Sequence, residues 1–219
     1  RDEPADYVYR AFIQVPWGIA WGPDSHLYVA DWLGGHVVRL APDGSMDDLG
    51  LWVTDPDFGD PLDVAFDNDG VLHAAGNYVM RIDANGDATR VNLNGTPNGG
   101  LAFDDEGDLY IAESHSGRIL RLHNGQTETV ASGLINPSSI EFGPDGYLYV
   151  AQREDSRVMR VDPDTGAKSV LFDAPVWGDV PYLTVDDDGD IWLFEKFSLY
   201  QISPSGDLKP FLVDGVEYQ

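Results

Sequence analysis

The chain of 219 residues carries 38 acidic and 13 basic side chains, which gives a formal net charge of −25 at pH 7. A surface this negative repels nucleic acid and anionic lipid, and no apolar run reaches the roughly 18 residues that a membrane span needs, so neither nucleic acid nor membrane insertion is expected. The chain has no cysteine, which excludes disulfides, a thiol nucleophile and thiolate metal ligands.

One phrase recurs five times along the chain, at steps of 45, 37, 39 and 43 residues. Each copy is a tight turn followed by an alternating apolar run. The copies read GPDSHLYVAD (22–31), DNDGVLHAAG (67–76), DDEGDLYIAE (104–113), GPDGYLYVAQ (143–152) and DDDGDIWLFE (186–195). A repeat of this length that is built from strands indicates a propeller or a solenoid.

The fourth copy and its flanks predict four short strands, over 138–142, 147–152, 157–161 and 167–172. Turns rich in Gly, Pro and Asp separate them, which is typical of antiparallel hairpins. A four-stranded meander about every 40 residues is a propeller blade. Helices are not expected, because no period near 3.6 is sustained and the chain has 24 glycines and 14 prolines.

The sequence therefore predicts an all-β protein, a β-propeller of four-stranded antiparallel blades that forms a single domain over 1–219. Five blades are expected, and residues 7–14 or 207–213 would add or complete an edge strand. A six-bladed ring that lacks one blade is the alternative. The expected blades span about 15–55, 60–95, 97–134, 137–174 and 180–214.

The segment GPDGYLYVAQREDSRVMRVDPDTG at 143–166 resembles an NHL-type propeller repeat. It is also similar to the wider group of gluconolactonase-like, YWTD and streptogramin-lyase propellers, and the resemblance covers nearly the whole chain. It implies the propeller fold but does not select a function, because these families include lyases, lactonases, receptor modules and binding domains.

The long, irregular connections lie at one end of the predicted blades, and functional sites concentrate on such loops. Aromatic side chains there suit sugars or the surface of a protein partner, although they could equally fill gaps between blades. The predicted ligand-binding residues are Trp17, Trp32, Trp177, Tyr182, Ser139 and Gln152.

Acidic residues suggest a second kind of site. Glu141 interrupts a column of small residues that is expected to face a central channel, where a carboxylate is costly unless it is hydrated or bound to a cation. Together with Asp63, Glu113 and Glu195 it could offer oxygen ligands to Ca²⁺ or Mg²⁺. His115 follows Glu113 by two positions and could act as a general base, since streptogramin-lyase-like propellers are expected to use a His and Glu pair.

The arginines that recur on the third strands, Arg39, Arg81, Arg121 and Arg160, are interpreted as ties between blades. The acidity has two open interpretations, an environment rich in salt or divalent cations, or the preference of Asp for turns.

The leading hypothesis is a non-catalytic module that binds a carbohydrate or a protein partner, requires no cofactor and holds at most a Ca²⁺ or Mg²⁺ ion at its channel. The alternative is a metal-assisted lyase or lactone hydrolase at the same mouth, so whether the protein is an enzyme stays open. We expect an extracellular or periplasmic protein, either a monomer or one domain of a longer chain.

Overall fold

The computed structural model consists of β-strands, turns and loops in the residues that it describes, which are 13–43, 46–47, 57–83, 85–173, 182–195, 198–209, 211–213 and 216–218. Within these ranges no helix has the length and apolar character needed to cross a membrane. The chain forms two compact units, Arg1–Gly100 and Leu101–Gln219.

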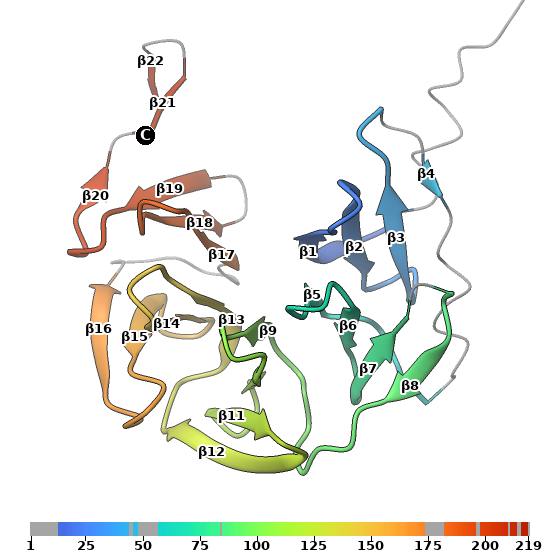
Figure 1. The fold of residues 1–219 in the computed structure, drawn as a ribbon. Helices are drawn as coiled ribbons and strands as arrows, with labels where there is room; N and C mark the ends of the chain where they lie inside the picture. Colours follow the sequence, from blue (N-terminus) through green and yellow to red (C-terminus); the bar gives the residue numbers. More distant parts are fainter. Residues whose placement is uncertain are drawn as a thin grey trace, which may run out of the picture. The chain divides into compact units, whose positions relative to one another are not determined.

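The first unit contains two four-stranded antiparallel sheets (Figure 1). Their strands are β1 (Pro16–Trp21), β2 (Leu27–Asp31), β3 (His36–Leu40), β4 (Met46–Asp47), β5 (Asp63–Phe66), β6 (Leu72–Ala75), β7 (Val79–Ile82) and β8 (Ala88–Arg90). In both sheets the strands follow one another in chain order, so each sheet is a meander.

The second unit contains three such sheets and a separate hairpin. Their strands are β9 (Leu101–Phe103), β10 (Leu109–Glu113), β11 (Arg118–His123), β12 (Gln126–Ser132), β13 (Pro137–Phe142), β14 (Leu148–Gln152), β15 (Arg157–Val161), β16 (Lys168–Asp173), β17 (Tyr182–Val185), β18 (Ile191–Glu195), β19 (Ser198–Ile202), β20 (Leu208–Lys209), β21 (Phe211–Val213) and β22 (Val216–Tyr218). The prediction of an all-β propeller fold with five four-stranded antiparallel blades is confirmed.

The predicted extra edge strand divides into two elements at the end of the chain. β20 pairs with β19 and is the outer strand of the fifth blade, whereas β21 pairs with β22 in its own hairpin. Of the other candidate strand, 7–14, residues 7–12 lie outside the described residues, and residues 13 and 14 are not in a strand.

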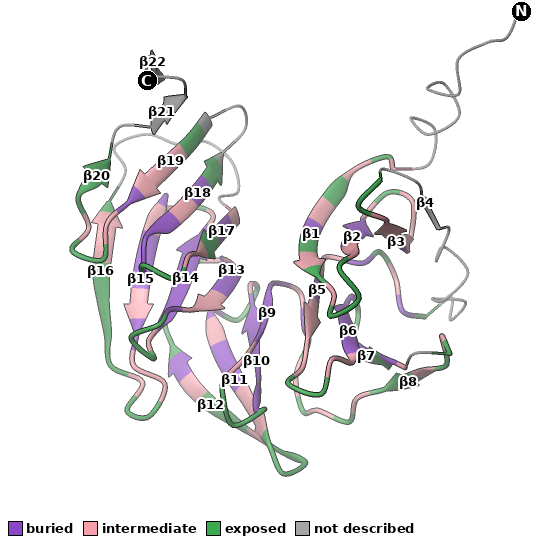
Figure 2. Cartoon of the chain, turned by 45° about the horizontal axis from the view of Figure 1, so that its top comes forward, coloured by how far each residue is buried: buried purple, intermediate pink, exposed green. Residues whose placement is uncertain are grey.

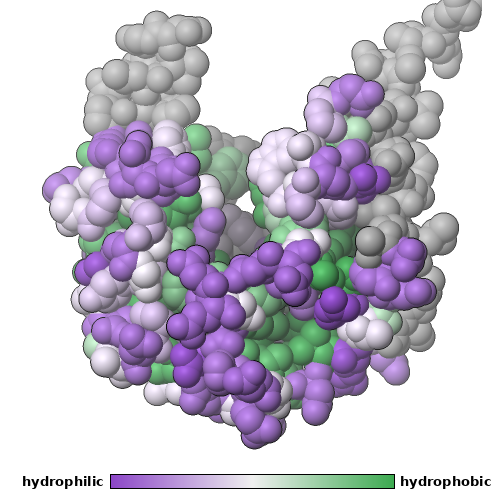
Figure 3. Space-filling model, viewed as in Figure 1, coloured by the Kyte–Doolittle hydropathy of each residue, from purple (hydrophilic) through white to green (hydrophobic). Residues whose placement is uncertain are grey.

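The core of each unit is built mainly on the second strands of the blades, which are buried on both faces. The second and third strands of the blades contain most of the buried residues, as the purple segments of Figure 2 show. Neighbouring blades pack through a tyrosine of one second strand and a phenylalanine of the next first strand. Tyr28 meets Phe66 edge-on with ring centroids 4.9 Å apart, and Tyr110 meets Phe142 at the same distance. Hydrophilic residues lie outermost in the space-filling view, with apolar residues behind them (Figure 3).

The acidic turns are held by their own carboxylates. Asp67 Oδ1 accepts the backbone N–H groups of Asp69 at 3.1 Å and Val71 at 2.8 Å. Asp104 and Asp186 make the same pair of bonds in their turns. This is the local side-chain-to-backbone bonding that makes Asp favourable in turns.

The printed sequence led us to expect that the recurring arginines tie neighbouring blades together, but the bonds described for Arg39 and Arg160 lie within their own blades. Arg39 Nε donates to Asp24 Oδ2 at 3.0 Å, and Arg160 Nη2 donates to Asp145 Oδ2 at 2.7 Å. Each arginine lies across from the second strand of its blade, as the pairing of Arg39 with Tyr28 shows. The nearest acid is therefore the aspartate of the turn that leads into that strand.

The first of these turns contains Ser25 in the left-handed region, at φ 63°, where the other four copies have glycine. A residue with a Cβ is disfavoured there. We expect Ser25→Gly to raise the free energy of unfolding by about 0.5–1 kcal/mol net. Relief of the left-handed strain exceeds the entropy that the more flexible glycine loses on folding. Urea denaturation of both proteins measures the difference, and a loss of stability would contradict it.

Candidate functional site

Two tryptophans that were predicted to bind a ligand lie together at one end of the first blade. The pairing of Pro16 with Asp31 brings the start of β1 beside the end of β2. Trp17 follows Pro16, and Trp32 follows Asp31, so both indoles lie at this end of the sheet. Their ring centroids are 5.0 Å apart with an interplanar angle of 46°, and both side chains are partly exposed.

A buried carboxylate, that of Asp31, fixes the backbone that leads into β1, next to this pair. Asp31 is 0% exposed, and its two oxygens accept the backbone N–H groups of Gln14 at 2.9 Å and Val15 at 2.7 Å. The backbone N–H of Trp32 in turn donates to the carbonyl of Val15 at 2.9 Å. His36 Nε2 lies 3.5 Å from the Asp31 carboxylate. The segment that leads into β1 and the loop that leaves β2 are therefore joined into one small platform.

Two glycines allow the loop after Trp32 to fold over this carboxylate. A Cβ at Gly34 would overlap the Asp31 side chain, and Gly35 has a φ of 67°. The same loop passes Asp60, whose exposed carboxylate lies 4.0 Å from the position that a Cβ on Gly35 would take. Sequence reasoning missed Asp60. The sequence feature that could have indicated it is the long, irregular connection TDPDFGDP at 54–61, which contains Asp60.

Asp63, one of the predicted metal ligands, borders the same platform. It is the first residue of β5, and a Cβ on Gly18 would come within 2.5 Å of the Cα of Asp63. Only a glycine fits at position 18, directly after Trp17. Asp63 belongs to the first unit, whereas Glu113, Glu141 and Glu195 belong to the second.

Glu113 forms hydrogen bonds within its own loop. Its side chain is 1% exposed, and Oε2 accepts hydrogen bonds from Ser116 Oγ at 2.7 Å and Arg118 Nε at 2.8 Å. It thus closes the turn between β10 and β11. His115 lies within this turn and is exposed.

Glu141 and Ser139 both bond the first strand of the next blade. Glu141 Oε2 accepts the backbone N–H of Val185 at 3.1 Å, and Ser139 Oγ lies 3.3 Å from the N–H and 3.4 Å from the carbonyl of Leu183. Burial raises the pKa of Glu141 to about 7, although its bonds to Thr184 and Val185 oppose the rise. A partly buried carboxyl here joins two blades.

The remaining predicted residues are distributed over the second unit. Gln152 accepts the N–H of Ile135 at 2.7 Å and donates to both oxygens of Asp155, so it organises its loops as Asp31 does. Tyr182 is the partly buried first residue of β17. Trp177 and the side chain of Glu195 lie outside the described residues.

A divalent cation is implied by some propellers of this group, so the acidic residues were compared with such a site. No group of three His, Asp or Glu side chains in the described ranges is arranged to hold a metal ion. Oε2 of Glu113 accepts hydrogen bonds from Arg118 and Ser116, and Oε2 of Glu141 accepts a backbone N–H. Within the described part of the second unit, Glu113 and Glu141 are thus bonded to protein groups and belong to no metal-binding cluster.

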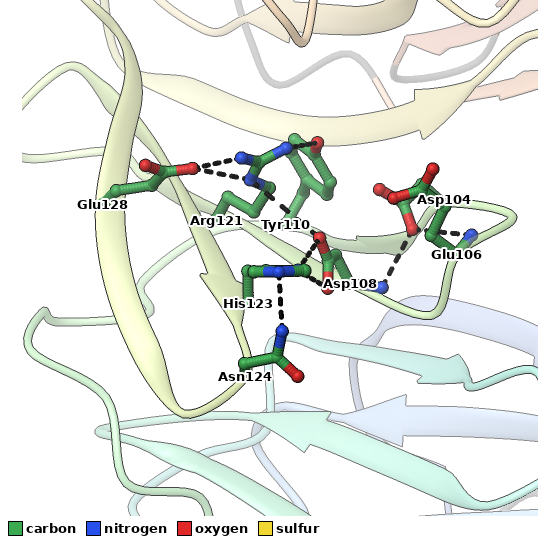
Figure 4. A network of polar contacts seen from close by, with 8 residues as sticks. All are labelled: Asp104, Glu106, Asp108, Tyr110, Arg121, His123, Asn124 and Glu128. Atoms are coloured by element: carbon green, nitrogen blue, oxygen red, sulfur yellow. Dashed lines mark hydrogen bonds and ion pairs between the residues drawn. The ribbon is translucent and has the colours of Figure 1, made fainter.

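A second polar cluster, in the third blade, lies at the opposite, turn end of its sheet (Figure 4). His123 Nδ1 is 2.7 Å and 2.8 Å from the two oxygens of the buried Asp108, and Asn124 Nδ2 is 2.7 Å from His123 Nε2. Arg121 Nε donates to Glu128 Oε1 at 2.7 Å. These groups are satisfied by one another and hold β10, β11 and β12 together.

Comparisons with known proteins give matches in structure alone. No family model and no curated protein matches the sequence. A virginiamycin B lyase from Staphylococcus aureus is 20% identical with a TM-score of 0.71, over 90% of this chain and 69% of that one. A gluconolactonase from Xanthomonas campestris is 20% identical with a TM-score of 0.74, over 90% and 76%.

A third match is a nidogen/laminin complex, which is 17% identical with a TM-score of 0.76 over 90% of this chain and 79% of that one. At such identities the similarity shows the fold and leaves the activity open. The chain has the β-propeller fold that these lyase, gluconolactonase and nidogen/laminin structures share.

Proposed function

We propose that this protein is a non-catalytic ligand-binding propeller module, and that a carbohydrate or a protein partner meets the loop end of its first blade. The observation behind this proposal is the Trp17–Trp32 pair, with ring centroids 5.0 Å apart. Indole rings offer large apolar faces with little conformational freedom to lose on binding, which suits them to sugars and to protein hot spots.

The support of the pair favours a binding role. The buried carboxylate of Asp31 and the glycines at 34 and 35 together determine the backbone conformation of the short loop that follows β2. Such backbone bonding preorganises the two rings, and preorganisation reduces the entropy lost on association.

The alternative of a metal-assisted lyase or lactone hydrolase draws on the fold shared with a virginiamycin B lyase and a gluconolactonase. Because Glu113 and Glu141 are bonded within the protein, no observation on the described residues favours it over binding.

The test is isothermal titration calorimetry with cellotetraose and triacetylchitotriose as probes, on the protein and on Trp32→Ala. We expect binding of at least one probe and a loss of at least tenfold in affinity in the variant, about 1.4 kcal/mol. Trp21→Ala is the matched control, because Trp21 is 67% exposed on the same strand but outside the pair. Affinity that Trp32→Ala leaves unchanged would contradict the proposal.

A further inference from the structure

We propose that the ligand of the Trp17–Trp32 pair is a carbohydrate that bears a protonated amine, an amino sugar without its acetyl group. The inference rests on the proposed binding function and names the class of its ligand.

Carboxylates border the platform. Asp31, directly before Trp32, is buried; Asp60, in the connection before β5, lies near Gly35 of the Trp32 loop; and Asp63 packs on Gly18 next to Trp17. Asp60 is exposed and has no hydrogen-bond or ion-pair partner among the described residues. A partly exposed aromatic pair in such a field attracts a cation through both the ring faces and the nearby acid.

Few basic residues of the first unit fall within the ranges that the structure describes. From residue 13 to residue 100 the sequence contains Arg39, Arg81 and Arg90 and no lysine. Arg39 bonds Asp24 at the opposite end of the first blade, and Arg90 lies over the Tyr78 ring with its guanidinium carbon 4.1 Å from the centroid. His36, the first residue of β3, has its Nε2 3.5 Å from the buried Asp31 carboxylate.

The tilted rings favour a sugar over a lysine side chain as the source of the amine. The two indoles are inclined at 46° to each other, and each has a flat apolar face on which the C–H face of a pyranose can lie. In an amino sugar the amine is attached directly to that ring, so one unit can contact an indole and place its charge towards Asp60. A lysine separates its charge from the backbone by a flexible stem, whose ordering costs entropy.

The experiment compares chitotriose with triacetylchitotriose by titration calorimetry at low salt, below the pKa of the sugar amine. The two probes share a backbone and differ in the charged amines. We expect chitotriose to bind at least tenfold more tightly, and this preference to shrink as salt is added. Trilysine, with a comparable charge and no sugar ring, is expected to bind at least tenfold more weakly than chitotriose.

Two variants assign the preference to this site. Asp60→Asn is expected to lower the affinity for chitotriose by about threefold to tenfold and to leave triacetylchitotriose unchanged, as one partly screened charge contact is lost. Asp69→Asn removes an equal charge from an exposed residue of the turn between β5 and β6, at the other end of the second blade, and is expected to change neither.

The outcomes separate the two proposals. Equal affinity for both sugars, with loss of both in Trp32→Ala, overturns the amino-sugar inference and leaves the binding function standing. Trilysine that binds as tightly as chitotriose also overturns the inference. If Trp32→Ala changes the affinity for none of the probes, the proposed function itself fails.

Discussion

Replacement of Gly166 by alanine is expected to lower the free energy of unfolding by about 3 kcal/mol. Gly166 lies in the turn between β15 and β16 with a φ of 68°, a region that residues with a Cβ rarely adopt. A Cβ there would also collide with the backbone carbonyl of Val130, which belongs to β12 of the preceding blade. The strain and the clash add, because a backbone oxygen in a sheet has little freedom to move away.

Gly125 is the matched control for this experiment. It occupies the corresponding turn of the third blade with a φ of 75°, but nothing lies within 4 Å of the position of its Cβ. Gly125→Ala should therefore cost only the backbone strain, about 1 kcal/mol. Urea denaturation of the three proteins measures both losses. Equal losses would show that the contact between Gly166 and the preceding blade contributes nothing.

Glu141→Gln is expected to stabilise the protein in alkaline solution by about 3 kcal/mol and to have little effect below pH 4.5. Burial raises the pKa of Glu141 from 4.5 to about 7, so the folded state binds a proton more tightly than the unfolded state does. The stability that this carboxyl contributes is complete below the unfolded pKa and is lost as pH rises through about 7. Glutamine keeps an oxygen for the Val185 N–H and carries no charge to bury.

The difference in unfolding free energy between wild type and variant, measured from pH 4 to pH 9, tests this dependence. Glu106→Gln removes one negative charge from an exposed position of the turn between β9 and β10 and accounts for the change in net charge. A stabilisation by Glu141→Gln that is constant across the pH range, or equal to that of Glu106→Gln, would show that ionisation of Glu141 is not its cause.

The blades could be predicted from the sequence because their information is local and repeated five times. Alternating stretches such as 147–152 indicate strands, and glycine at the turns indicates where strands end. The alternation did not show that β14 is buried on both faces, along all five of its residues. The extra strand was harder to predict, since Leu208 and Phe211 both fall in the single strand expected over 207–213. The structure places them in different sheets, in β20 and β21. The strand with which each segment pairs depends on partners elsewhere in the chain, which no local pattern specifies.

The site was predicted in part. Trp17, near the start of β1, and Trp32, directly after β2, are 15 residues apart in sequence. The blade pattern alone placed both at the loop end, where they are in contact. The partners of carboxylates could not be read in the same way. Glu113 and Glu141 look alike as candidate ligands, but one bonds an arginine of its own blade and the other a backbone N–H of the next. Such choices depend on rotamers and on contacts between distant segments.

The turn aspartates have a consequence for how this protein's charge can change. In the turn between β19 and β20 the N–H of Asp207 is accepted by the hydroxyl of Ser203, at 3.0 Å, where Asp83 accepts the N–H of Asp87 in the second blade. A neutral oxygen therefore serves the same geometry. Asparagine at Asp67, Asp83 and Asp104 would keep an acceptor in each turn and bring the net charge from −25 to −22. The shape of the blades and the charge of the surface can consequently evolve independently.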